Sequence, residues 1–214
     1  MNKAIKIFYQ GLSIALYPML IPTYGMAMFF TAYSNNLYPL SAGYAATACA
    51  ATLFFTCLLP LGMILLMRRR GEIDSIYLTE RTQRLKPYMY SIAGFIVWCF
   101  FTGYTLHAPL CVVWTSIGAT TAIAIVSLVN LKWKISAHLC AMGGLAGGIM
   151  SCSLSMGISP MTTLVVVLVL SLLLMYARIW LGVHTPEQTV AGFLTGLLCT
   201  TIPNFIRLTC LNYV

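Results

Sequence analysis

A histidine and an arginine lie next to a predicted helix start in the segment ARIWLGVHTPEQ, residues 177–188. Arg178 precedes His184 by six residues, and the four residues that follow His184 read T-P-E-Q. Thr185 and Gln188 match a T-x-x-Q capping box, with proline at the first helical position. A helix that begins there directs free N–H groups and a positive dipole towards anions. The segment is therefore suited to bind a phosphoryl group.

A second polar segment, KWKISAH, supplies another histidine and a hydroxyl group at the start of another predicted helix. Ser136 can cap this helix and donate its hydroxyl, and Ala137 offers a backbone N–H. His138 can give a proton to a leaving oxygen, and Lys134 adds a cation one turn earlier.

A third segment, TERTQRLKP, carries cations just before a predicted helix that begins near Pro87. Arg81, Arg84 and Lys86 lie within six residues of one another. Guanidinium groups match phosphate oxygens with two parallel hydrogen bonds. The preceding arginines at 68–70 are read as an ordinary basic patch next to a membrane.

Each segment also has a simpler explanation. Gln188 could be only a helix cap, and Arg178 could extend to lipid headgroups. His184 and His138 could be polar residues at the membrane interface. The hypothesis of a shared site depends on the three segments lying together.

The composition predicts a membrane protein. The chain has 214 residues, of which 60% are hydrophobic and 7% charged, with mean hydropathy +0.88. Several apolar runs approach or exceed the ~20 residues that a helix needs to cross a bilayer. The net charge of +8 lies in connections between these runs, and no nucleic-acid-binding module is recognisable, so anionic headgroups or phosphate are the expected partners. The eight cysteines show no metal-ligand spacing and are predicted to be buried thiols.

The apolar runs predict an all-α, polytopic transmembrane bundle of about six to seven spans in a single domain, residues 1–214. The first run is read as a retained span rather than a cleaved signal. Two spans separate each consecutive pair of polar segments, so all three segments should share one membrane surface. Every Lys and Arg except Arg207 falls on that side, which the positive-inside rule would make cytoplasmic, although a phosphate site would collect the same residues. The predicted spans are 11–31, 41–67, 88–106, 110–129, 139–158, 161–181 and 189–206.

Small residues mark the helices that follow the last two polar segments. The sequence GGLAGG pairs Gly143 with Gly147 and Gly144 with Gly148, and 192 and 196 are glycines at the same spacing. Small faces let membrane helices approach closely. Ordinary packing explains these glycines, and it predicts that the two helices are neighbours.

The three segments together resemble the type 2 phosphatidic acid phosphatase family, which shares its site with the vanadium haloperoxidases. The family pattern is K-x6-R-P, then P-S-G-H, then S-R-x5-H-x3-D. Here the third motif reads A-R-x5-H-x3-Q and the second reads I-S-A-H. The first reads T-x6-K-P, with Lys86 at the arginine position and Thr79 at the lysine position. The resemblance covers residues 79–206, and the replacement of aspartate by Gln188 is its largest departure.

The resemblance implies an inner-membrane lipid phosphatase that needs no metal or cofactor. His184 would attack phosphorus and His138 would protonate the leaving oxygen, with Gln188 orienting His184. The phosphoryl oxygens would be held by Arg178, Lys86, Arg84, Arg81, Ser136, Ala137 and Lys134. Expected substrates are polyprenyl diphosphate, phosphatidylglycerophosphate, phosphatidate or lipid A phosphates.

Two other functions fit the same sequence. A non-catalytic protein of this fold would bind lipid phosphates without releasing phosphate. A transporter would place ionisable residues deep within its spans, but His107, near a predicted hairpin tip, is the only candidate outside the three segments and the chain ends.

Overall fold

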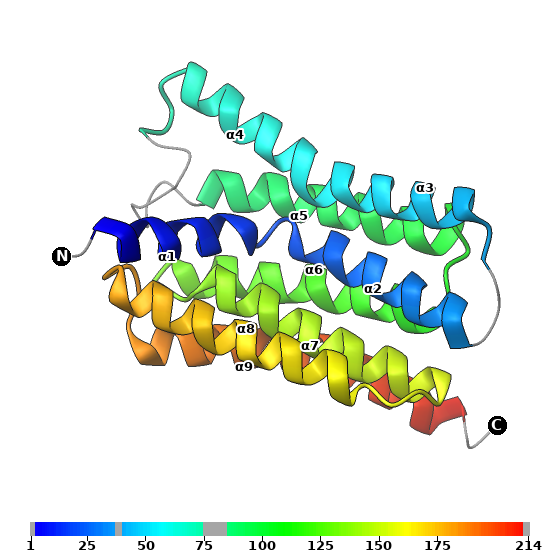
Figure 1. Ribbon diagram of the computed structural model, residues 1–214. Coiled ribbons are helices and arrows are strands. Elements are labelled where there is room, and N and C mark those ends of the chain that lie inside the picture. The colour runs from blue at the N-terminus through cyan, green and yellow to red at the C-terminus, as the bar shows by residue number, and fades with distance from the viewer. Residues whose placement is uncertain (1–2, 37–39, 75–84, 212–214) are drawn as a thin grey trace.

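The computed structural model describes residues 3–36, 40–74 and 85–211, and its described residues form helices and connections without a strand. The prediction of an all-α fold is confirmed. The long helices lie side by side in one bundle (Figure 1). In chain order they are α1 (Lys3–Ala15), α2 (Ile21–Asn36), α3 (Ala42–Leu53), η1 (Phe54–Leu58), α4 (Leu59–Arg69), α5 (Leu85–Phe100), η3 (Phe101–Thr105), α6 (Leu110–Asn130), α7 (Ala137–Met156), α8 (Met161–Trp180) and α9 (Pro186–Leu211).

Five helices among the described residues are long and apolar enough to cross a membrane. Four of them are α6, α7, α8 and α9, and the fifth is the continuous helix formed by α3, η1 and α4, Ala42–Arg69. That helix includes a π-helical turn, η1, directly before Pro60. At 28 residues it is about 42 Å long, which exceeds the ~30 Å hydrocarbon core.

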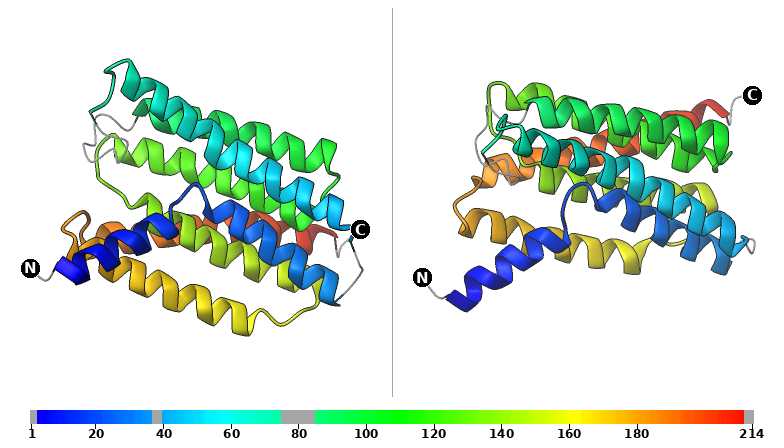
Figure 2. Two further views of the ribbon diagram at one scale, coloured as in Figure 1. Left: turned by 45° about the horizontal axis from the view of Figure 1, so that its top comes forward. Right: turned by 90° about the horizontal axis from the view of Figure 1, so that it is seen from above.

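The region predicted as a first span at 11–31 is not one helix. Helix α1 ends at Ala15 and α2 begins at Ile21, with Pro18 between them and Pro22 in the first turn of α2. A proline has no N–H to donate to the preceding turn, so the helix breaks there. Figure 2 shows α1 and α2 pointing in different directions on either side of this break.

Side chains of the bundle satisfy carbonyl groups that the break releases. Backbone polar groups that are buried away from water must find such partners. The carbonyl of Ser13 accepts from Nε2 of His138 at 3.1 Å. The carbonyl of Ala15 accepts from the hydroxyl of Tyr24 at 3.0 Å. The carbonyl of Met19 accepts from the hydroxyl of Thr56 at 3.1 Å.

Helices α7 and α9 form the most extensive contact between helices in the described part of the chain. A Cβ atom added at Gly143 or Gly147 would overlap the backbone of α9, and one added at Gly192 or Gly196 would overlap the backbone at the start of α7. Glycine is required at these positions because the two backbones touch. The prediction that these helices are neighbours is confirmed.

The described parts of the three polar segments lie at the same end of the bundle. This end contains the C-termini of α4, α6 and α8 and the N-termini of α5, α7 and α9 (Figure 1). The even number of crossings between segments predicts this arrangement. The seven described cysteines are free thiols, each buried or half-buried, as predicted.

Candidate functional site

The turn between α8 and α9 brings His184 back over the last turn of α8. Gly182 has φ +69°, a left-handed conformation that glycine adopts without steric cost. The backbone N–H groups of Val183 and His184 then donate to the carbonyl of Arg178 at 3.1 and 3.3 Å. These bonds hold the backbone of His184 next to that of Arg178. His184 is buried, with 7% of its surface exposed.

Gln188 fixes the orientation of the His184 ring. The amide oxygen of Gln188 lies 3.3 Å from the N–H of Thr185, a group that can only donate, which identifies the atom there as the oxygen. The same oxygen lies 3.0 Å from Nδ1 of His184. Nδ1 therefore carries the proton in the neutral ring, and Nε2 keeps its lone pair.

The predicted capping box at the start of α9 is present. The N–H of Gln188 donates to Oγ1 of Thr185 at 3.5 Å, and the side chain of Gln188 accepts from Thr185 in return. Helix α9 begins at Pro186. Gln188 thus serves both as a helix cap and as the partner of His184.

Ser136 joins the N-terminus of α7 to the N-terminus of α9. Its hydroxyl caps α7 by accepting from the N–H of Leu139 at 3.4 Å, as the sequence predicts. Its own N–H donates to the carbonyl of Gln188 at 3.1 Å. Two helix N-termini, each with a positive dipole end, therefore lie side by side.

His138, the second residue of α7, contacts the break between α1 and α2. Its Nε2 lies 3.1 Å from the carbonyl oxygen of Ser13, and a carbonyl can only accept, so Nε2 carries a proton. The ring of Tyr17 packs edge-on against the imidazole, with 5.9 Å between ring centroids. His138 thus holds a proton at a defined atom.

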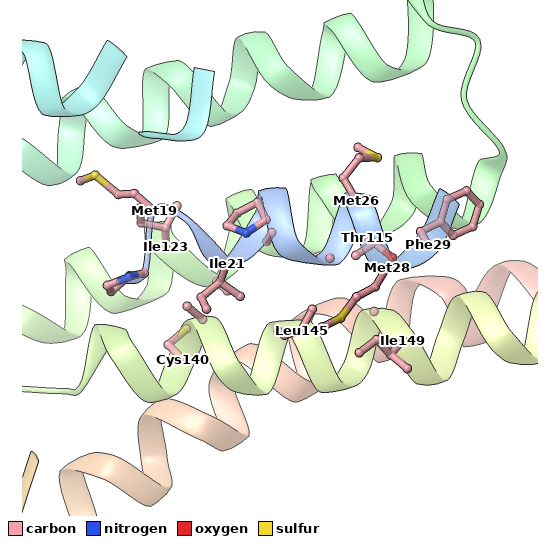
Figure 3. A pocket seen from close by; sticks show the side chains of 18 of the residues that line it. Met19, Ile21, Met26, Met28, Phe29, Thr115, Ile123, Cys140, Leu145 and Ile149 are labelled. Atoms are coloured by element: carbon pink, nitrogen blue, oxygen red, sulfur yellow. The ribbon is translucent and has the colours of Figure 1, made fainter. Parts of the chain in front are cut away.

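Arg178, His184, Ala137 and His138 line one cavity of about 400 Å³. Figure 3 shows part of this cavity, between α2, α6 and α7. Segments 130–138 and 177–188 are therefore brought together. Gln188 and Ser136 do not line the cavity, but their hydrogen bonds position groups that do. Lys134 is half-buried in the connection before α7 and also lies outside the lining.

The third segment contributes less to this cavity. Arg81 and Arg84 lie outside the described residues. The ammonium of Lys86 is 2.7 Å from the carboxylate of Glu72, with 68% of the lysine side chain exposed, and Lys86 does not line the cavity. The hydrogen bond from Lys86 holds the pKa of Glu72 below its ordinary value. Among the described residues of this segment, Pro87 lines the cavity.

Sequence reasoning missed Ser13 and Tyr17, which contact His138. Both lie in or beside the break that divides the predicted first span. The available signal for a break was a pair of prolines inside that run, Pro18 and Pro22, which are four residues apart.

Comparisons of the chain with models of protein families, with curated proteins and with solved structures find no match. Among the described residues, no group of three or more His, Cys, Asp and Glu side chains is placed to hold a metal ion.

Proposed function

We propose that this protein is a metal-independent membrane phosphatase that hydrolyses a lipid phosphate or diphosphate through a phosphohistidine intermediate. The observation that carries the proposal is the pairing of His184 with Gln188, which keeps the lone pair on Nε2 of a histidine that lines one cavity with Arg178 and His138. The likeness of the three sequence motifs to the type 2 phosphatidic acid phosphatases supports the same reaction.

In the first step, Nε2 of His184 attacks phosphorus and the bond from phosphorus to the leaving oxygen breaks. His138 gives its proton to that oxygen, which leaves as an alcohol or as a phosphate monoester. The proton on Nδ1 of His184 stays on the hydrogen bond to Gln188. In the second step, His138 takes a proton from water, the water oxygen bonds to phosphorus, and the P–N bond breaks to release inorganic phosphate.

Stabilisation of charge on the phosphoryl oxygens is the main electrostatic task of such a site. Arg178 and Ala137, whose N–H is a proposed donor, line the cavity together with the two histidines. Lys86 and Lys134, at the same end of the bundle, are proposed as further cations. Arg81 and Arg84, which lie outside the described residues, are proposed in the same role from the motif. Lys86 would exchange its bond to Glu72 for one to phosphate, and Ser136 would act through the cap that it gives α7.

The proposed substrates are amphiphiles because the site lies at one end of a bundle with five helices long enough to span a membrane. Polyprenyl diphosphate, phosphatidylglycerophosphate, phosphatidate and lipid A phosphates share the required chemistry, a phosphoryl group on a hydrocarbon anchor. The proposed location is the inner membrane of the cell.

A lipid-phosphate-binding protein without catalysis is the second candidate. Two contacts favour it: Gln188 gives His184 a neutral partner where the family has a carboxylate, and the proton of His138 is held by the carbonyl of Ser13. Such a protein would retain the cationic cavity and bind lipid phosphates, but it would release no phosphate.

The decisive experiment measures phosphate release from a panel of lipid phosphates by purified protein in EDTA. We expect release that vanadate inhibits and that His184→Ala abolishes, with His138→Ala slower by about 10²–10⁴-fold. His107→Asn is the matched control: His107 lies in the connection before α6, away from the cavity, and asparagine tolerates its positive φ of 47°. If the panel yields no phosphate above the His184→Ala background, the binding function replaces the enzyme.

A further inference from the structure

The cavity is far longer than a phosphate group requires. Its lining begins at Arg178 and His184 and continues to Met156, Ser159 and Thr163, at the opposite end of α7 and the start of α8. Along α7, the distance from His138 to Met156 is about 27 Å at 1.5 Å per residue. The cavity therefore extends over nearly the thickness of a bilayer's hydrocarbon core.

Beyond the two histidines and Arg178, the middle of the lining is mainly apolar. Figure 3 shows Met28 of α2 facing Leu145 and Ile149 of α7, and Met26 and Phe29 belong to the same lining. Methionine side chains are flexible and adapt to the shape of an apolar partner. This surface is chemically matched to hydrocarbon rather than to a polar substrate.

Small residues keep the space open. On α7, Gly143 and Gly147 contact α9. Gly144 and Gly148 line the cavity, and a Cβ atom added there would also meet Thr200 of α9 and Thr115 of α6 respectively. Protein interiors are normally close-packed, so a space of about 400 Å³ is the size of a ligand site rather than a packing defect. The other small residues of the lining include Gly25, Ala119, Ala122 and Ala141.

We propose that this cavity holds one hydrocarbon chain of the lipid substrate and limits the length of chain that the protein accepts. The phosphate would lie at Arg178 and His184, and the chain would run along α7 towards Met156. The proposal rests on the proposed function for the position of the phosphate. A volume of about 400 Å³ spread over about 27 Å leaves a narrow cross-section, which fits one chain rather than two.

The protein would select lipid chains by how well each chain fits the cavity. A lipid tail in a bilayer already lies in hydrocarbon, so moving it into an apolar cavity gains little from the hydrophobic effect. A chain that matches the cavity fills it, whereas a side chain that projects into the cavity excludes a long chain and leaves a short one unaffected.

The first test narrows the cavity at half its depth. Ala119 lies at the middle of α6 and lines the cavity, so Ala119→Trp should block it there. Val169→Trp is the matched control, because Val169 is half exposed on α8 and lies outside the lining. We expect phosphate release from hexadecyl phosphate to fall at least about tenfold in Ala119→Trp, while release from octyl phosphate and both rates in the control stay within about twofold. Unchanged release from hexadecyl phosphate in Ala119→Trp would overturn the proposal.

The second test locates the chain without requiring turnover or a substitution in the apolar part of the cavity. Hexadecyl phosphate with a diazirine at its terminal carbon is photolysed on the His184→Ala variant in detergent, and the labelled peptides are identified. We expect labels near Met28 and Met156 that unlabelled hexadecyl phosphate suppresses. Labels confined to outward-facing residues of α8, such as Val165, would refute the chain site.

The two proposals fail in different ways. Labelling inside the cavity without phosphate release from any lipid would leave the chain site standing and remove the enzyme. Phosphate release with labelling only on the outer surface would leave the enzyme standing and remove the chain site.

Discussion

A single change of charge at Gln188 tests the proposed chemistry of His184. Glutamate has the length of glutamine, so Gln188→Glu should keep the hydrogen bonds to Nδ1 of His184 and to the N–H of Thr185. The sequence T-x-x-E is still a capping box, and the start of α9 should therefore be unchanged. The variant adds a negative charge 3.0 Å from the ring and alters little else.

The expected gain follows from the burial of the pair. Two unit charges 4 Å apart interact by about 1 kcal/mol in water and about 4 kcal/mol at an effective dielectric constant of 20. His184 is buried and Gln188 half-buried, which places the interaction between these limits, at about 2 kcal/mol. The ring becomes cationic as Nε2 attacks phosphorus, so the carboxylate should accelerate this step about thirtyfold.

The assay follows the burst of phosphohistidine formation, because a later step could mask the effect on steady-state turnover. Glu187→Gln is the matched control: Glu187 is the exposed neighbour of Gln188, and its removal should change the burst by less than about twofold. Gln188→Ala loses the orienting hydrogen bond and should be about tenfold slower than the unchanged protein. A Gln188→Glu burst no faster than that of the unchanged protein would refute the assignment of His184 as the nucleophile oriented by residue 188.

Four further predictions concern stability, each measured by thermal unfolding in detergent. Gly196→Ala should lower the free energy of unfolding by about 1–3 kcal/mol, since its methyl group would overlap the backbone of α7. Gly144→Ala finds only ordinary contacts and should stabilise by about 0.5–1 kcal/mol; equal midpoints for these two variants would contradict the helix contact. Thr185→Ala removes one capping bond and should cost about 1 kcal/mol, and no loss would show that the cap is not formed. The hydrogen bond from Lys86 lowers the pKa of Glu72, so this pair stabilises the fold above the ordinary carboxyl pKa and loses that effect as the pH falls through the lowered value. The midpoints of Lys86→Met and the unchanged protein should therefore converge in acid, and a constant difference would exclude the pair as its cause.

The helices that carry the two histidines could be predicted because their signals are local. Ser136 and the Thr185–Gln188 box are capping residues whose hydrogen bonds form within one turn, and the structure contains both. The close contact of α7 and α9 was also predictable, since glycines at a spacing of four on both helices let the two backbones touch.

The first helix pair could not be predicted in the same way. The apolar run at 11–31 has the length and hydropathy of a span, and hydropathy does not register where a backbone bends. The bend depends on partners remote in sequence, such as His138 for Ser13 and Thr56 for Met19. A sequence reveals Pro18, but it does not reveal whether the rest of the bundle supplies donors for the carbonyls.

The cations of the first motif show a second limit. Lys86 matches a motif position, yet it forms an ion pair with Glu72, a residue that the pattern does not include. A motif records which residue types are present, whereas competition among nearby charges decides where each side chain points.

Under the proposed mechanism, the hydrogen bond between His138 and Ser13 involves the N-terminal helix in each reaction cycle. The Nε2–H of His138 cannot donate to a backbone carbonyl and to a departing oxygen at the same moment, so the proposed acid step requires the carbonyl of Ser13 in α1 to move away from that proton. A bulky fusion or a surface tether at the amino end would hinder this movement. Tags for purification or immobilisation are therefore better attached at the carboxyl end, beyond α9.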